Sequence, residues 1–398
     1  MYKKLSSPLF VVFVTLLLSK LGENIIFPLL PFILSSYNPD GLTLGLLAST
    51  SQTIAVLSGP ISGSISDSIG RRPVIVGCIV LNLISLLLFG WAGSLALIFT
   101  SRAIGGLGAS TIGTLQAYIT DISTPETRSK NLGISGAAFG LGAIAGPALG
   151  GGLVGYGANV PIFVAAGLTG INVLIGVFFL KESLNSENKK KFSLSSMNVF
   201  VSIGKLFIDK TIRNIALGFA FFNLSFTAFT SLLVLGLKDL YGWTAGQTSG
   251  IFIVVGITLT YTQVGLIGKL VNKFGEKRIN QYGMLFVSFG IILIPLAGYA
   301  FVLTATLIVI ASMSLAIGAA FVLPTARSLV SGLVSSQDQG VMLASLASLS
   351  GIASSLGPII AGWLYDKNTF SSFAFEAGAC LIGWFLINKT DSKKLSNI

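Results

Sequence analysis

The chain has 398 residues, of which 53% are hydrophobic and only 10% are charged. Soluble domains carry about 25% charged residues, so this composition excludes a protein whose whole surface faces water. The chain contains no His, which excludes His-ligated zinc or haem, and its two cysteines lie in apolar runs, which argues against a disulfide scaffold. We therefore expect neither a cofactor nor a bound metal.

Apolar stretches long enough to cross a bilayer, about 20 residues each, recur along the whole chain. The first follows Met1-Tyr2-Lys3-Lys4 without a small-residue cleavage site, so we interpret it as a spanning helix and not as a removed signal peptide. The predicted spans are 8–34, 44–66, 74–92, 95–118, 131–153, 161–180, 213–236, 245–268, 279–300, 303–332, 340–363 and 372–388. The sequence therefore predicts an all-α polytopic membrane protein with twelve transmembrane helices.

The basic residues give this protein its orientation. The formal net charge is +11, but nearly all Lys and Arg residues fall in the segments on one side of the predicted membrane. Lys238 and Lys367 fall on the other side, and Lys20, Arg102 and Arg327 lie within predicted helices. Positive loops stay in the cytoplasm, so we expect a cell-membrane protein of bacterial inner-membrane type with both termini cytoplasmic. The same pattern explains the high charge without nucleic acid as a partner.

A polar, basic segment at 181–212 interrupts the series of apolar spans. We interpret it as a cytoplasmic linker, part of which forms a helix on the membrane surface. It separates a six-helix bundle at 1–180 from a second at 213–398. Two matches between the halves indicate a duplication: Gly63 to Arg72 resembles Gly268 to Lys277, and Gly146-Pro147 resembles Gly357-Pro358.

The loop after the second predicted helix reads Gly63-xxx-Asp67-xx-Gly70-Arg71-Arg72-Pro73. Glycine permits close helix approach and an unusual backbone angle, the acid can form an ion pair across the loop, and the arginines suit anionic headgroups. An ordinary positive loop is the alternative, but the fixed spacing of glycines, acid and bases favours a specific motif.

This loop resembles the signature loop of the major facilitator superfamily. Further segments are similar to motifs of that family: Arg102 to Gly108, Asp121 to Arg128, the helical run Gly142-xxx-Gly146-Pro147-xx-Gly150, and Pro28-Leu-Leu-Pro31. The set resembles the twelve-helix drug/proton antiporters, including the tetracycline exporters. The resemblance implies the major facilitator fold, two six-helix bundles around a central cavity, and transport by alternating access.

The sequence departs from the tetracycline exporters at positions that matter. Those proteins carry acidic residues in helices 1 and 3, where this chain has Ser19 and Ser85. Asn272 replaces the signature acid in the second half, so that loop cannot form the same charged contact. The resemblance therefore implies the family but not tetracycline–magnesium as the solute.

Ionisable residues inside spanning helices cost roughly 2.5–3.5 kcal/mol each on insertion scales. Lys20, Glu23 and Asn24 share one face of the first helix. Measured from the outer end of its helix, Glu23 lies about 16 Å deep, and Arg102 of helix 4 lies about 10 Å deep. These depths are close enough for the residues to share one polar layer. Our hypothesis is that Glu23 accepts the proton, with Lys20 and Arg102 modulating its proton affinity. A permanent Lys20–Glu23 ion pair that only orders helix packing is the alternative.

Two further groups of residues are candidates for function. The predicted solute-binding residues are polar or aromatic side chains within the spans: Asn24, Gln52, Gln116, Phe222, Phe226 and Tyr261. An apolar pocket with a few polar groups suits an amphiphilic solute, although any single Phe could face lipid. The predicted gating residues, as the resemblance implies, are Gly63, Asp67, Gly70, Arg71, Asp121, Arg128, Gly142, Gly146, Pro147 and Gly150.

Together these features predict a secondary transporter that exports a small amphiphilic solute against inward proton flow, with lipids as surroundings and a monomeric state. The alternative within transport is a symporter or facilitative importer of a nutrient or metabolite. A polytopic membrane enzyme would need a catalytic cluster, and without His and with few intramembrane acids we find none. A receptor-like sensor would need an output domain, and we expect none in this sequence.

Overall fold

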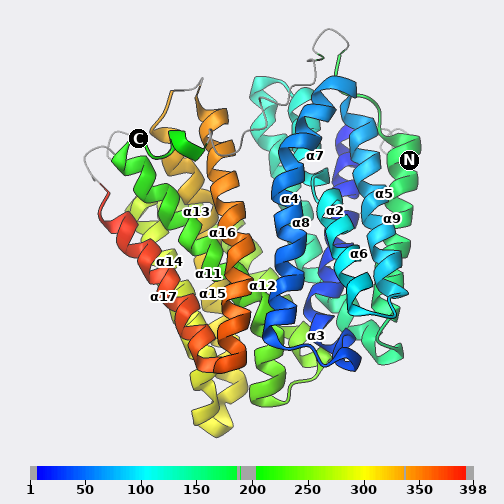
Figure 1. The fold of residues 1–398 in the computed structure, drawn as a ribbon. Coiled ribbons are helices and arrows are strands. Elements are labelled where there is room, and N and C mark those ends of the chain that lie inside the picture. The colour runs from blue at the N-terminus through cyan, green and yellow to red at the C-terminus, as the bar shows by residue number, and fades with distance from the viewer. Residues whose placement is uncertain (1–6, 186–188, 190–202, 336–337, 391–398) are drawn as a thin grey trace. The chain divides into compact units, whose positions relative to one another are not determined.

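The computed structural model describes residues 7–185, 189, 203–335 and 338–390. Within these residues the fold is helical (Figure 1), which confirms the predicted all-α class. The helices are α2 (Pro8–Ile26), α3 (Leu30–Ile33), α4 (Gly41–Ile69), α5 (Arg71–Gly90), α6 (Leu95–Gly108), α7 (Thr111–Asp121), α8 (Pro125–Leu153), α9 (Val160–Phe179), α11 (Lys210–Tyr241), α12 (Ala245–Tyr261), α13 (Ile267–Phe274), α14 (Glu276–Leu296), α15 (Thr304–Gly332), α16 (Gln339–Lys367) and α17 (Thr369–Asn388).

By length and composition, 12 helical segments of the described chain can cross a membrane, in the order that the sequence predicts. Three of them are interrupted. A 3-10 turn at Phe27–Leu29 separates α2 from α3, where Pro28 and Pro31 each remove a backbone donor. The fourth segment breaks between α6 and α7, and a π-helical turn at Thr262–Leu266 joins α12 to α13.

The chain forms two compact units. Unit 1 contains Met1–Tyr37, Thr50–Met197 and Ala245–Ile253, and unit 2 contains Asn38–Ser49, Asn198–Thr244 and Val254–Ile398. The first residues of α4 and of α12 thus belong to the unit opposite to the rest of their helix. The linker stretch expected to lie on the membrane surface runs through residues 199–208. Residues 199–202 lie outside the described residues; residues 203–205 are helical, and a turn follows at 206–208.

The two units repeat one packing scheme, as the internal sequence matches predict. In unit 1, α2 packs against α8 and α9, and α5 packs against α6 and α9. In unit 2, α11 packs against α16 and α17, and α14 packs against α15 and α17. The matched Gly-Pro pairs occupy equivalent places, because a side chain at Gly146 would meet Asn24 on α2 and one at Gly357 would meet Leu224 on α11. Each unit therefore holds its first helix close to its fifth by a glycine contact.

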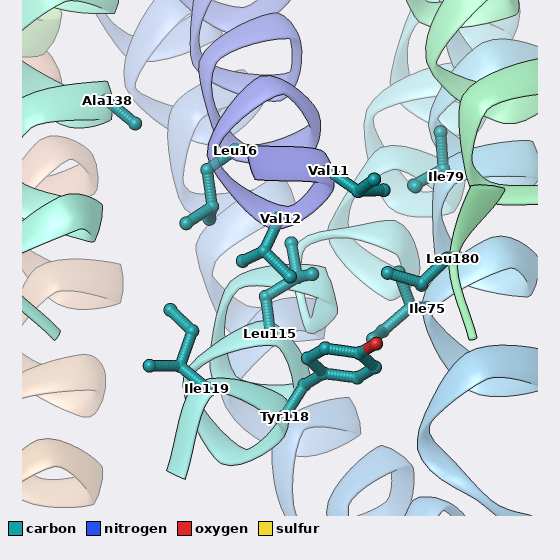
Figure 2. Close-up of a cluster of buried hydrophobic side chains, with 10 residues drawn as sticks. All are labelled: Val11, Val12, Leu16, Ile75, Ile79, Leu115, Tyr118, Ile119, Ala138 and Leu180. Carbon is teal, nitrogen blue, oxygen red and sulfur yellow. The ribbon is translucent and has the colours of Figure 1, made fainter. Parts of the chain in front are cut away.

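A buried apolar cluster lies in unit 1 near the start of α5 (Figure 2). It joins Val11, Val12 and Leu16 of α2 to residues of α5, α7 and α8 and to Leu180. Tyr118 of α7 is 1% exposed within it. Because Asp121 ends the same helix one turn later, the cluster fixes the position of the charged residues at this end of the unit.

Candidate functional site

Lys20 and Glu23 form an ion pair in the middle of the first spanning segment, which is the contact that the alternative to the proton-site hypothesis requires. The Lys20 Nζ atom donates to the Glu23 Oε2 atom at 2.6 Å. The Lys20 side chain is only 16% exposed, and its ammonium lies 5.2 Å from the centre of the Phe139 ring on α8, a cation–π distance. The Glu23 side chain is 61% exposed. The base is thus held by packing, while the carboxylate remains accessible.

The glycines of α8 bring that helix onto the polar face of α2. A Cβ atom at Gly142 would lie 2.7 Å from the Lys20 Cβ atom, and one at Gly146 would lie 2.5 Å from the Asn24 Cβ atom. Both distances are below any normal carbon–carbon contact, so only glycine allows this approach. The glycine motif therefore positions Lys20 and Asn24 from the neighbouring helix. Gly150, one turn further, contacts the carbonyl of Ile25 in the same way.

Arg102 of α6 lies near this polar face without joining the ion pair. Its guanidinium carbon is 5.5 Å from the centre of the Phe89 ring, and its side chain is half-buried. Among the described residues Arg102 makes no ion pair within 4.0 Å, but its charge interacts with Glu23 through space. Of the three residues expected to act together, Lys20 and Glu23 are in direct contact, and Arg102 is a more distant third charge.

The remaining predicted solute-binding residues differ in exposure. Gln52, Gln116 and Tyr261 are exposed, and Asn24 and Phe226 are partly buried. Phe222 is fully buried, with its ring stacked between Phe219 and Phe226 at centroid distances of 6.1 and 5.5 Å. In this conformation Phe222 packs α11 and has no surface that a solute could contact.

A second group of charges lies where α4 ends and α5 begins. The guanidinium of Arg71 donates to Asp67 Oδ1 at 2.5 Å, to Asp121 Oδ2 at 3.0 Å and to the Ser66 hydroxyl at 2.7 Å. Three of the four predicted charges therefore meet. Arg128 is exposed and forms no ion pair with a described residue, so it stays apart from this cluster.

Glu182 completes the cluster, although no motif predicts it. Its two carboxylate oxygens accept from the backbone N–H groups of Arg71 and Arg72 at 2.9 and 3.1 Å, which caps the start of α5. Partial burial opposes its ionisation, but these donors and those of Leu184 and Ser183 hold its pKa below the usual range. Gly70 is required beside it, since its φ is +125° and any side chain would meet the Glu182 carboxylate.

Comparisons with known proteins agree with this architecture. The family model described as Major Facilitator Superfamily matches residues 12–317 and again residues 266–397. The chain belongs to the Major Facilitator Superfamily. It is a multi-pass membrane transporter, as the twelve spans and the relatives of the family require.

Relatives within the superfamily match almost the whole chain. Multidrug resistance protein 2 of Bacillus subtilis (strain 168) is 29% identical over 384 residues, 94% of this chain and 92% of the relative. The class C tetracycline resistance protein of Escherichia coli is 27% identical over 383 residues, 95% of both chains. Among solved structures, a single-residue mutant of the nucleoside transporter NupG aligns with a TM-score of 0.80 at 14% identity, over 96% of this chain and 100% of that chain.

Ser19 and Ser85, the two serines expected to replace acidic residues of the tetracycline exporters, hold hydrogen-bonded hydroxyls. Ser19 accepts a hydrogen bond from Asn172 Nδ2 at 3.0 Å, and Ser85 donates to the Ser101 carbonyl at 2.6 Å. Asn172 is fully buried and also donates to the Thr15 carbonyl. These contacts join α2 to α9 and α5 to α6 without adding charge, so the acidic residue of α2 is Glu23.

Sequence reasoning also missed Glu376, which α17 buries inside unit 2. A single acid within an apolar span was a usable signal, because such residues are costly and rare in spanning helices. Glu376 belongs to none of the recognised motifs, so the sequence alone assigns it no function.

Proposed function

We propose that this transporter exports a small amphiphilic solute by alternating access, driven by protons that bind Glu23. The observation that carries the proposal is the Lys20–Glu23 ion pair in the middle of the first spanning segment, held at 2.6 Å. Ionisable groups at this depth are costly and are typical of ion and substrate pathways. The 61% exposure of the Glu23 side chain leaves room for a proton or a solute group to reach it.

The ion pair supplies a physical means of coupling. While Glu23 is ionised, Lys20 donates to it; when Glu23 takes a proton, the attraction is lost and the Lys20 ammonium is left beside Phe139 alone. A solute that competes with Lys20 for the carboxylate therefore changes its affinity for protons, and protons change its affinity for solute, because the linkage is reciprocal. Arg102 is a further positive charge that interacts with Glu23 through space.

The solute class follows from polar side chains of unit 1 and from the relatives. Gln52 and Gln116 are exposed and suit a largely apolar molecule with a few polar groups. Relatives named for multidrug and tetracycline resistance support export. The uncharged Ser19 and Ser85 favour a solute other than a tetracycline–metal complex.

The basic residues support an orientation with both termini in the cytoplasm and the α4–α5 loop on the same side. On that topology the Asp67–Arg71–Asp121 cluster and Glu182 form a cytoplasmic gate that stabilises one conformation of unit 1. Breaking it would be part of the opening step of the cycle. We expect the protein to work as a monomer in the bacterial inner membrane, with lipids as its only other partners.

The test uses the purified full chain in liposomes with an imposed pH gradient and a panel of fluorescent lipophilic cations. One pH unit supplies about 1.4 kcal/mol per proton, enough for about a tenfold solute gradient. We expect solute to move against the protons. Glu23→Gln keeps a hydrogen-bonding side chain beside Lys20 and should lose pH-driven accumulation while retaining downhill solute exchange.

Glu126→Gln serves as the matched control, because Glu126 is exposed at the start of α8, remote from the ion pair. Normal coupled transport by Glu23→Gln would reject Glu23 as the proton site. Solute movement in the same direction as protons would instead indicate a symporter.

A further inference from the structure

Glu376 is a buried carboxyl in unit 2 that the mechanism above does not use. Its side chain is 1% exposed. The Ser372 hydroxyl donates to its Oε1 atom at 3.1 Å, and its Oε2 atom has no hydrogen-bond partner among the described residues. Glu376 is the eighth residue of α17, about 10 Å from the start of a helix that spans the membrane.

The helices packed around α17 offer this carboxyl no cation. They are α11, α14 and α16. The charged residues of α11 lie within its first four and last four positions, those of α14 within its first three, and those of α16 at its last two. The nearest titratable group on α17 is Cys380, one turn away, whose thiol donates to the Met284 carbonyl at 3.4 Å. In the described part of unit 2, Glu376 is therefore buried without a charged partner.

A carboxylate in this place would be very unstable. An ion buried without a counter-charge costs many kcal/mol, and one hydroxyl donor offsets little of that cost. The neutral acid fits the contacts instead: Oε1 is the carbonyl oxygen that accepts from Ser372, and Oε2 holds the proton. We propose that Glu376 is a second proton-binding carboxyl of the transport cycle, loaded in this conformation.

The packing around Glu376 explains how its proton would be tied to conformation. The adjacent Phe373 ring packs edge-on against Phe229 of α11 at a centroid distance of 6.2 Å, and the Ser288 hydroxyl of α14 donates to the Ala377 carbonyl at 3.2 Å. Water reaches Oε2 only if α17 separates from these helices. Once ionised, Glu376 opposes their return until a proton rebinds. The protonated state thus favours the packed conformation, and by linkage the packed conformation favours the proton.

Infrared spectroscopy of the purified full-length protein tests the proton directly. A protonated carboxyl has a C=O stretching band separate from carboxylate and amide bands. We expect this band at neutral pH in the wild type and in Glu23→Gln, and its loss in Glu376→Gln. Ser372→Ala keeps the acid but removes the donor to Oε1, so the band should move to higher frequency. Glu126→Gln, which alters an exposed acid, should leave it unchanged.

The role in transport is a separate measurement and rests on the proposed proton coupling. Solute-induced proton release is followed with a pH indicator in weakly buffered detergent solution, using the same lipophilic cations. Glu376→Gln should release fewer protons per bound solute than the wild type, and Ser372→Ala should release the same number as the wild type. An unchanged infrared band, or unchanged proton release, in a folded Glu376→Gln protein would overturn the proposal. Wild-type protein without any solute-linked proton release would count against the proposed function, while the infrared result on Glu376 would still stand.

Discussion

The contact between α8 and α2 gives the sharpest prediction about stability. Replacing Gly146 by Ala adds a Cβ atom that would lie 2.5 Å from the Asn24 Cβ atom and 3.0 Å from the Asn24 carbonyl carbon. Optimal carbon–carbon contacts are about 3.5–4.0 Å, so the two helices must separate by about 1 Å. Overpacking of this kind costs about 1–3 kcal/mol.

The same helix supplies the matched control. Gly136 also lies within α8, and a Cβ atom there would meet nothing within 4 Å. Gly-to-Ala changes in open helical positions are favourable by up to about 1 kcal/mol. Thermal unfolding in detergent should therefore show a lower midpoint for Gly146→Ala and an equal or higher midpoint for Gly136→Ala. If Gly146→Ala were as stable as Gly136→Ala, the glycine face of α8 would not set the helix spacing, and the account of how Lys20 is positioned would fail.

Two predictions concern the charge cluster at the start of α5. Glu182→Gln should destabilise the protein by about 0.5–2 kcal/mol, the range for lost helix caps, as measured by thermal unfolding at neutral pH. Because the pKa of Glu182 is lowered in the folded state, its stabilisation is present above the ordinary Glu pKa of about 4.3. That stabilisation is lost as pH falls through the lowered value, so the gap between wild type and variant should close in acid; a gap independent of pH would contradict the charge-based cap. Asp121→Asn should slow solute transport in the liposome assay more than Arg128→Gln does. The reason is that Asp121 accepts hydrogen bonds from both Arg71 and Ser183, whereas Arg128 is outside the cluster. Equal effects of the two substitutions would argue against a gate centred on Arg71.

Features that depend on local spacing could be predicted from the sequence. The spans follow from the length of apolar runs, and the break at Phe27–Leu29 coincides with Pro28 and Pro31. The Lys20–Glu23 and Asp67–Arg71 pairs lie three and four residues apart, where helical side chains meet. By contrast, the π-helical turn at Thr262–Leu266 contains no Pro.

Features that depend on how helices far apart in the sequence pack against each other could not be predicted from local spacing. Glu182 caps a helix that begins 111 residues earlier, and only the fold brings the two together. Phe222 and Phe226 belong to one aromatic stripe, yet the first is fully buried and the second is not, because the rotation of α11 decides their exposure. Arg128 stands within a recognised motif, yet it is exposed and forms no ion pair with a described residue.

The repeated architecture separates packing from charge. Both units hold their first and fifth helices together with glycine contacts, at Gly146 on Asn24 and at Gly357 on Leu224. Both turn into their third helix through a glycine with positive φ, at Gly70 and Gly275. Yet Asp67 has its counterpart in Asn272, which cannot form an ion pair, and the acid that follows Gly275, Glu276, accepts from the Ser328 hydroxyl instead of from an arginine. The contacts that fix helix spacing thus recur in both units, whereas the Asp67–Arg71–Asp121 charges, which can hold a conformation closed, belong to unit 1. The buried acid of unit 2, Glu376, is neutral in our proposal. Each unit would therefore respond to protons differently. In unit 1, binding of a proton breaks the Lys20–Glu23 ion pair; in unit 2, release of a proton from Glu376 disfavours the packed conformation.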